Sequence, residues 1–455
     1  MSRTTRCRAQ LAALAAGLAV SSLALAAPNT AVRSQAFVSW ARATAIALRT
    51  VEQQADESDL APLRKIVGSA RVVALGEPGH GGHQPLAFRN RLFAYLVEHC
   101  GFTAIALETS FTESQRVDKY VLGGPGHAGS VVKHSLTWGF EDYEENVQLV
   151  RWMRNYNEHA GGRRKLHFYG MDMSGANDDA AYPHAAIAVL SVVDYLRRAA
   201  PESSKALLTR LAPQLSRLKS VGYQRLAADH DPALNALLNS LGAFLHREGP
   251  GLIRASSRSD YAWAVRGIVI ARQLEQLLGL PLGPDANPSG VDPDGYLQVA
   301  SRDESMAANV LWALRQEGPA GRLMVFAHDG HVMNDRTRGG IWAVFRHAPQ
   351  MMGMHLRARL GRKLVILGQI AARNGPGLPA AKPLPGSLET ALTALRLPLF
   401  VLDLHEARGG AAAWLRERHP IRANFDSDLD IVPAQAFDGL IYISRVTPAM
   451  RNDSP

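Results

Sequence analysis

The chain has 455 residues, of which 47% are hydrophobic and 20% charged, so it can bury a sizeable core. Its formal net charge of +9 comes from 50 basic and 41 acidic residues. The basic residues are scattered and form no long tracts, which gives little support to nucleic-acid binding.

The first 26 residues have the pattern of a secretory signal peptide. A basic start with three arginines precedes an apolar run over 11–25, and Ala24-Leu25-Ala26 fits a small-x-small cleavage site. The run is short for a membrane span, which needs about 20 residues. We therefore expect cleavage near Ala26, which lowers the net charge from +9 to +6, and a periplasmic or secreted protein without a membrane span. Cys7 leaves with the signal, so Cys100 has no disulfide partner, and we expect it to be buried and unreactive.

Strands alternate with helices in the next part of the chain. Residues 27–68 look helical, and after them the apolar periodicity predicts strands over 71–75, 103–107 and 166–169, and helices over 84–100, 113–122 and 143–157. Such alternation is typical of an α/β fold with a mostly parallel or mixed central sheet flanked by helices. We expect residues 27–182 to form the first part of an α/β catalytic core.

The pattern changes between 183 and 295. Helices are predicted over 185–199, 203–218, 232–247 and 261–278, with no strand between them, and 279–295 reads as a loop rich in Pro, Gly and Asp. We expect residues 183–295 to form a helical insertion that serves as a lid. Residues 296–455 then return to the α/β pattern, with a helix over 302–316 and strands over 323–327, 364–370, 399–402 and 439–443.

Ionisable residues follow three of the predicted strands. Strand 71–75 leads into a Gly/Pro turn with Glu77 and His80, strand 103–107 ends in Glu108, and strand 323–327 ends in His328, with His331 three positions later. Ligands bind at the carboxyl edge of open α/β sheets. Two carboxylates and three imidazoles at that edge suit proton-transfer chemistry.

Each of these residues has a catalytic and a structural interpretation. His80 is a candidate general base because imidazole titrates close to neutral pH, and Glu77 would orient it or position a water molecule. Glu108 ends an apolar strand, so its carboxylate needs a partner or a raised pKa, and it fits an ion pair as well as a catalytic acid. His328 and His331 fit metal binding, orientation of a base, or stabilisation of an oxyanion.

Four neighbouring residues receive lesser roles. Arg89 and Arg91 lie on the helix after the first turn, and one of them could stabilise negative charge at the site. His83 is expected to be a neighbouring loop residue, and Asp172 at the end of strand 166–169 is expected to form structural hydrogen bonds. The chain contains no Gly-x-Ser-x-Gly nucleophile elbow, no Walker loop and no dinucleotide fingerprint, which argues against a covalent serine hydrolase and against a nucleotide cofactor.

Taken together, these motifs resemble the erythromycin esterase family. The resemblance rests on Gly-Glu-x-x-His at 76–80, Arg89, Glu108 and Ala-His-x-Gly-His at 327–331. Softer matches are Trp138 and the segments 152–157, 168–172, 302–307 and 352–356. The resemblance spans roughly residues 65–445, which is most of the mature chain.

The resemblance implies hydrolysis of a cyclic ester, such as the lactone of a macrolide ring, without a covalent intermediate. His80 would deprotonate water that Glu77 or Glu108 orients, and Arg89, His328 and His331 would hold the substrate or stabilise the oxyanion. The expected partner is a small-molecule ester or lactone, and neither a cofactor nor a metal is expected. The helical insertion would roof the substrate site.

Two alternatives remain open from the sequence. The first is a metal-dependent hydrolase in which Zn²⁺ or a similar ion, bound by the same Glu/His cluster, activates water. The second is an exported small-molecule binding protein without catalytic activity. It is motivated by Pro78-Gly79, because the family usually has Ser or Thr directly before the motif histidine.

Overall fold

A central sheet organises the molecule, which is described here from a computed structural model. The structure describes residues 31–53, 55–173, 186–220, 232–280, 293–379, 383–423 and 427–454, so the expected signal peptide lies outside the described residues. The sheet has eight strands, in the order β1 (Ile46–Ala47), β7 (Leu399–Asp403), β10 (Gly439–Ile443), β6 (Leu364–Ala371), β2 (Val72–Glu77), β5 (Leu323–His328), β3 (Ala104–Ser110) and β4 (His167–Asp172). Neighbours from β10 to β4 pair in parallel, and β7 and β1 are antiparallel additions at one edge. The expected α/β class, with a mostly parallel sheet flanked by helices, is confirmed.

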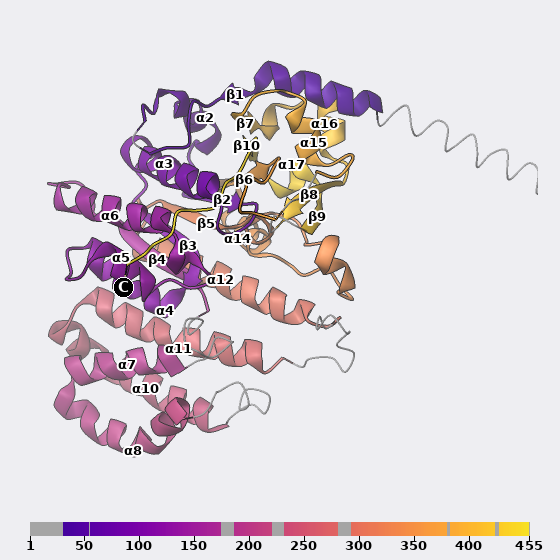
Figure 1. Cartoon of the computed structure of the whole chain (residues 1–455). Helices are drawn as coiled ribbons and strands as arrows, with labels where there is room; N and C mark the ends of the chain where they lie inside the picture. The colour runs from indigo at the N-terminus through magenta and orange to yellow at the C-terminus, as the bar shows by residue number, and fades with distance from the viewer. Residues whose placement is uncertain are drawn as a thin grey trace, which may run out of the picture.

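The strands are buried on both faces. In β2, Val72 and Ala74 belong to one hydrophobic cluster, whereas Val73 and Leu75 belong to the other. Successive strand residues point to opposite faces, so an apolar run without polar alternation requires cover on both sides. The helices that follow the strands provide this cover, as Figure 1 shows.

The helices outside the insertion largely follow the predicted ranges. They are α2 (Leu63–Val67), α3 (His83–Cys100), α4 (Phe111–Val121), α5 (Ala128–Lys133), α6 (Glu144–Glu158), α12 (Tyr296–Gln316), α13 (Asp329–Val332), α14 (Met352–Leu360), α15 (Leu388–Thr393), α16 (Gly409–Leu415) and α17 (Pro433–Ala436). Segment 27–68, expected to be helical, is divided in its described part into a helix over 31–44, the short strand β1 and α2. The hairpin of β8 (His419–Ala423) and β9 (Ser427–Ile431) was not predicted. In the described ranges no helix is both long and apolar enough to cross a membrane.

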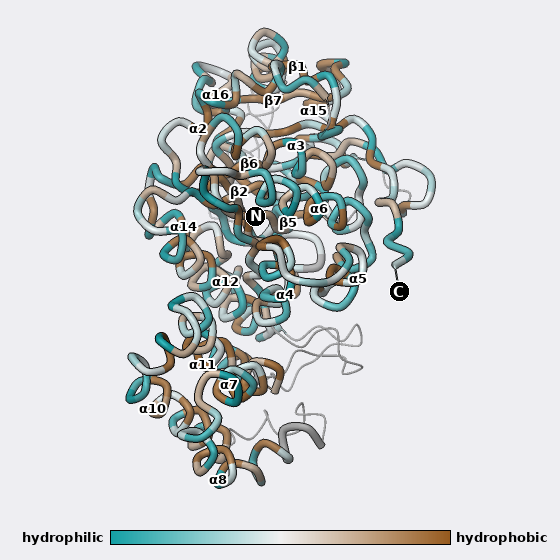
Figure 2. Tube along the Cα trace, turned by 90° about the vertical axis from the view of Figure 1, so that its left-hand side faces the viewer, coloured by the Kyte–Doolittle hydropathy of each residue, from teal (hydrophilic) through white to brown (hydrophobic). Residues whose placement is uncertain are grey.

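In the described part of the predicted insertion the chain forms the helices α7 (Ala186–Ala199), α8 (Pro201–Ser220), α10 (Pro232–Ala255) and α11 (Arg258–Leu278). They form a layer at one end of the molecule, at the bottom of Figures 1 and 2, with hydrophobic residues facing one another. This layer contacts the rest of the molecule through α4 and α12. A pocket between α11, α12 and the end of β4 is lined by Met173, Leu274 and Arg302. The insertion therefore approaches the sheet from the β4 side, and its role as a lid stays a prediction.

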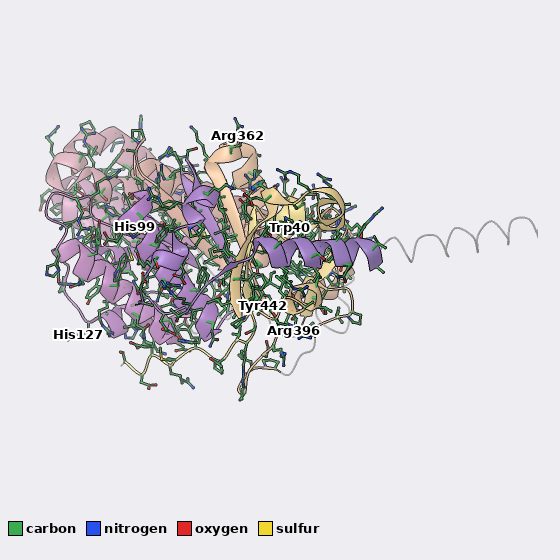
Figure 3. The ribbon with its side chains drawn as sticks, turned by 90° about the horizontal axis from the view of Figure 1, so that it is seen from above. Trp40, His99, His127, Arg362, Arg396 and Tyr442 are labelled. Carbon is green, nitrogen blue, oxygen red and sulfur yellow. The ribbon has the colours of Figure 1, made fainter. Side chains whose placement is uncertain are left out.

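Both ends of the described chain are anchored. Near the N-terminus, Phe37 stacks on Trp414 of α16 with ring centroids 4.1 Å apart, and Figure 3 shows this helix with Trp40 labelled. At the C-terminus, segment 444–454 runs from β10 toward α5, as Figure 1 shows. It crosses the turn after β2, where the Ala449 amide donates to the Gly81 carbonyl at 2.8 Å. This crossing segment fixes the turn that carries His80.

Candidate active site

The strand ends bring the predicted residues together. Glu77 and His328 are register partners at the ends of the adjacent strands β2 and β5. Glu108 was expected to end its strand, but β3 continues to Ser110, so that expectation is wrong. The pairing of β3 with β4 shifts between Leu107 and Ser110, and an irregularity of this kind changes the direction of a side chain within a strand.

The first half of the site is the Glu77–His80 pair. His80 Nδ1 hydrogen-bonds to Glu77 Oε1, while His80 Nε2 faces Glu108 Oε2 at 3.9 Å. The Glu77 side chain is fully buried, whereas 27% of the His80 side chain is exposed. Burial raises the pKa of Glu77, and the neighbouring His80 offsets only part of this effect. Burial lowers the pKa of His80, but the two carboxylates outweigh burial and raise that pKa above its ordinary value.

The second half of the site holds Glu108 as a carboxylate. Glu108 Oε2 accepts the His328 backbone N–H at 2.9 Å, and Oε1 accepts from Arg302 Nη2 at 2.8 Å. Glu108 Oε1 also lies 3.1 Å from His331 Nε2. Burial would raise the pKa of Glu108, but His331, His80 and Arg302 outweigh it and hold that pKa well below its ordinary value. The ion-pair interpretation of Glu108 is thus present in the structure, next to the candidate base.

His331 and Arg302 are themselves fixed by acids. His331 Nδ1 lies 3.0 Å from both carboxylate oxygens of Asp303, and Arg302 Nε donates to Asp172 at 3.0 Å. Burial lowers the pKa of His331, but Asp303 and Glu108 outweigh it and raise that pKa to about 10. His331 is therefore an imidazolium near neutral pH. Asp172 forms structural hydrogen bonds, as expected, by accepting from Arg302.

His328 has the opposite protonation state. Its Nδ1 accepts the Gly330 backbone N–H at 3.0 Å, which places the ring proton of the neutral form on Nε2. Burial, assisted by the positive charge of His80 and His331, lowers the pKa of His328 to about 3. Its Nε2 is buried and has no hydrogen-bond partner among the described residues, and its ring lies 6.0 Å from the His80 ring. A buried donor without a partner is costly unless a ligand uses it.

Both predicted arginines of α3 are buried. The fully buried Arg89 donates to Asn90 and Asn146, and its guanidinium carbon lies 4.9 Å from the centre of the Phe326 ring. Arg91 bonds to Asp59 on the other side of the helix. Arg89 contributes positive potential near Glu77, and its expected role in holding the substrate stays a prediction. Arg302 is the arginine that bonds to Glu108.

Other predicted residues lie outside the reacting centre. His83 begins α3, and its Nδ1 lies 2.6 Å from Glu145 Oε1. Cys100, at the far end of α3, is half-buried, and burial raises the pKa of its thiol, which keeps it unreactive. Among the described residues, no Ser, Thr or Cys side chain hydrogen-bonds to His80, and no three His, Cys, Asp or Glu residues are grouped to hold a metal ion.

Sequence reasoning missed the charged partners from α12 and the aromatic residues after α5. Arg302 and Asp303 belong to segment 302–307, one of the weaker matches to the family. The sequence pointed to them only through an adjacent basic and acidic residue on a predicted helix. Phe140 packs edge-on against His80, with ring centroids 5.0 Å apart. The Tyr143 hydroxyl lies close to Gly81, where an added Cβ would be 2.8 Å from it, so the positive φ of 88° at Gly81 and this contact both require glycine.

Comparison with known proteins gives a consistent assignment. A family model described as erythromycin esterase matches residues 97–446. The chain is 26% identical over 308 residues to erythromycin esterase type II of Escherichia coli, covering 65% of this chain and 68% of that protein. It is 23% identical over 419 residues to the putative hydrolase YbfO of Bacillus subtilis strain 168, covering 87% of this chain and 88% of that one.

Solved structures agree in fold. A crystal structure of a Bacillus cereus protein has a TM-score of 0.75 at 25% identity, covering 92% of this chain and 98% of that chain. The erythromycin esterase EreC, solved as a mutant in its open conformation, has a TM-score of 0.65 at 18% identity, covering 90% of this chain and 100% of that one. The family model covers most of this chain and the neighbours share its sheet and helices, so the chain belongs to the erythromycin esterase family, whose members are hydrolases of the esterase type.

Proposed function

We propose that this protein hydrolyses a carboxylic ester, with a lactone such as a macrolide ring as its substrate, by means of a water molecule that His80 activates. The observation that carries the proposal is the position of His80 between two carboxylates. Glu77 binds its Nδ1, its Nε2 lies 3.9 Å from Glu108 Oε2, and 27% of the His80 side chain is exposed. The substrate class, a macrolide-like ester, is supported by the family and by the names of two relatives, erythromycin esterase type I and type II.

The first step is deprotonation of water. Glu77 holds the Nδ1 proton of His80, which leaves the lone pair of the neutral ring on Nε2. A water molecule bound between Nε2 and Glu108 Oε2 gives one proton to Nε2 and directs its other hydrogen at the carboxylate. General-base catalysis of this kind contributes roughly 10²–10⁴-fold. Glu77 then stabilises the imidazolium.

The next step is attack on the ester carbonyl. The hydroxide forms a bond to the carbonyl carbon, and negative charge moves to the carbonyl oxygen. The Nε2–H of His328, which has no partner among the described residues, is available to donate to that oxygen. A neutral imidazole suits this task because it donates a hydrogen bond without competing with His80 for the water proton. Donors of this type are worth about 3–4 kcal/mol to the transition state.

Collapse of the tetrahedral intermediate completes hydrolysis. The bond to the alkoxide oxygen breaks, and the proton on His80 Nε2 moves to that oxygen. Acid and alcohol are formed, or a hydroxy acid when the substrate is a lactone, and the enzyme returns to its starting state. No protein side chain forms a bond to the substrate, consistent with the absence of a hydroxyl or thiol at His80 among the described residues.

Mass spectrometry of lactones incubated with the purified protein tests this proposal. We expect erythromycin A or a related lactone to gain one water, with no burst of product and no adduct on the quenched protein. Unchanged lactones with the wild-type protein would overturn the assignment and favour the small-molecule binding protein. A stable acyl adduct would overturn the direct-water mechanism.

Export is also part of the proposal. The basic start, apolar run and small-residue cleavage site in residues 1–26 support removal of a signal peptide near Ala26 and a periplasmic or secreted location. N-terminal sequencing of protein recovered from the periplasm and the medium tests it. An uncleaved N-terminus in the cytoplasm would contradict it.

A further inference from the structure

We propose that Trp138 is the substrate-binding platform of this site, and that it selects esters carrying the flat face of an uncharged saturated ring. This inference rests on the proposed esterase function, since it assigns the group that positions the ester beside His80. It starts from the left-handed backbone conformation of Trp138.

Trp138 has a backbone conformation that bulky residues avoid. Its φ is 65°, and the following Gly139 has a φ of 86°. The Phe140 amide donates to the Thr137 carbonyl at 3.2 Å, so residues 137–140 form a turn with two left-handed central residues. Turns of this kind favour Asn, Asp or Gly at the first central position. A tryptophan there is strained, and strain at such positions is associated with function.

The turn is fixed to the strand that carries Glu108. The Thr137 amide donates to Thr109 Oγ1 at 2.8 Å, and the Ser110 amide donates to Thr137 Oγ1 at 3.0 Å. Phe140, at the last position of the turn, packs against His80. Trp138 therefore has a defined position relative to both halves of the reacting centre.

Trp138 lies against the fixed charges of the site. The guanidinium carbon of Arg302 is 5.3 Å from the centre of the Trp138 ring, and the same Arg302 bonds to Glu108. At the same time 37% of the Trp138 surface is exposed, and it is the one aromatic residue among the large hydrophobic side chains that the described part of the chain exposes. Arg302 orients the ring from one side, and the remaining surface is free to bind a ligand.

The chemistry of this surface indicates the ligand. An indole face gives a broad, rigid apolar contact, which suits a rigid ring better than a flexible chain because fewer rotations are lost on binding. A cationic ligand would meet Arg302 on the opposite face. An anionic ligand would meet a network in which Glu108, Asp172 and Asp303 outnumber Arg302 and His331. An uncharged saturated ring, in a macrocycle or a sugar attached to it, fits best.

The test uses two esters with the same number of carbon atoms, cyclohexyl acetate and n-hexyl acetate, together with erythromycin A. We expect Trp138→Gly to lower kcat/KM for cyclohexyl acetate and erythromycin A by about 10-fold, mainly through a higher KM, in keeping with loss of one apolar contact surface. The value for n-hexyl acetate should stay within about 3-fold. Trp138→Phe should restore part of the preference, and Trp40→Phe, in the N-terminal helix, is the matched control with no effect.

Stability provides a second readout. Glycine adopts a left-handed conformation without strain, which offsets the stability lost with the Trp138 contacts, so the thermal unfolding midpoint of Trp138→Gly should stay close to that of the wild type. Equal losses for both acetates, or a loss only in kcat, would overturn the platform role. A lowered midpoint with equal losses would show that Trp138 is only structural. If the wild type hydrolyses none of the three esters, the proposed esterase function fails. If the wild type is active but its ester preference does not depend on Trp138, only the platform role fails.

Discussion

Glu77 and Glu108 are both almost completely buried, on strands that flank β5, yet their carboxyl groups behave in opposite ways. Burial raises the pKa of Glu77, whose second oxygen has no partner among the described residues. Glu108 has a strongly lowered pKa because two cationic groups and a backbone N–H bind it. Burial therefore does not set the state of a carboxylate by itself, and the number of charged donors decides it.

The comparison divides the site into a pair in which a proton moves and a network in which charges stay fixed. Glu77 and His80 form the pair, and Glu108 belongs to the network with Arg302 and His331. A proton can move only where two states are close in free energy, whereas fixed charges provide a constant field for the transition state. The predictions below test this division.

The largest effect is expected for His80→Ala, since it removes the proton acceptor. We expect kcat to fall by about 10³-fold or more, within the range for general-base catalysis, with an unchanged circular dichroism spectrum. His83→Ala is the matched control, an imidazole three residues later at the start of α3 that bonds to Glu145, and it should change kcat only a few-fold. Equal activity of wild type and His80→Ala would exclude the proton-transfer pair.

His328→Phe should lower kcat by about 10²-fold, because it removes the proposed oxyanion donor. His328→Gln, which keeps an N–H, should recover part of the loss. The pKa of His328 is lowered to about 3, so the folded state stays neutral while the unfolded state takes up a proton below about 6.5. Wild-type stability should therefore fall as the pH drops from 6.5 toward 3, and His328→Phe should lose less over this range. Identical acid unfolding of the two proteins would count against this buried neutral state.

Glu108→Gln separates the two carboxylates by pH dependence. Activity requires neutral His80, whose raised pKa predicts that kcat/KM declines as the pH falls through a value above 6.5. Removing the Glu108 charge should lower that pKa, so the acidic limb should move to lower pH, with a loss of about 10²-fold at the plateau. Glu158→Gln, an exposed acid on α6, is the control. An unshifted limb in Glu108→Gln would show that Glu108 does not act on His80.

Arg302→Lys tests the fixed network more gently. Lysine keeps the charge but lacks the planar fork that bonds Asp172 and Glu108 together, so we expect about a 10-fold loss in kcat and a slightly lower unfolding midpoint. Arg151→Lys, at an exposed position of α6, should leave both unchanged. Wild-type kinetics in Arg302→Lys would mean that Glu108 needs only a nearby positive charge.

Metal removal should have the smallest effect. We expect dialysis against EDTA to change kcat/KM less than about 2-fold, because the charges that hold Glu108 come from protein side chains. Elemental analysis before and after dialysis is the accompanying measurement. Loss of activity together with loss of a stoichiometric ion would establish the metal-dependent alternative.

Local sequence patterns predicted much of the fold. The apolar runs at 71–75 and 323–327 became β2 and β5, and the amphipathic pattern after the Gly/Pro turn became α3. The turn itself placed His80 three residues from Glu77, within hydrogen-bonding reach. Less was predicted where local preference is weak, as in the short strand β1, the β8–β9 hairpin and the segment 444–454 that crosses the His80 turn.

The sequence by itself determined the α/β class, the helices of the expected insertion and the candidate base. Each of these follows from a pattern of residues that are close together in the chain. Only the tertiary structure decided the partners of Glu108. Arg302 is 194 residues away from it, whereas Arg89 and Arg91, the first two arginines after His80, are buried in the interior. Contacts over such separations follow from how the sheet and helices pack, and pKa values follow from those contacts.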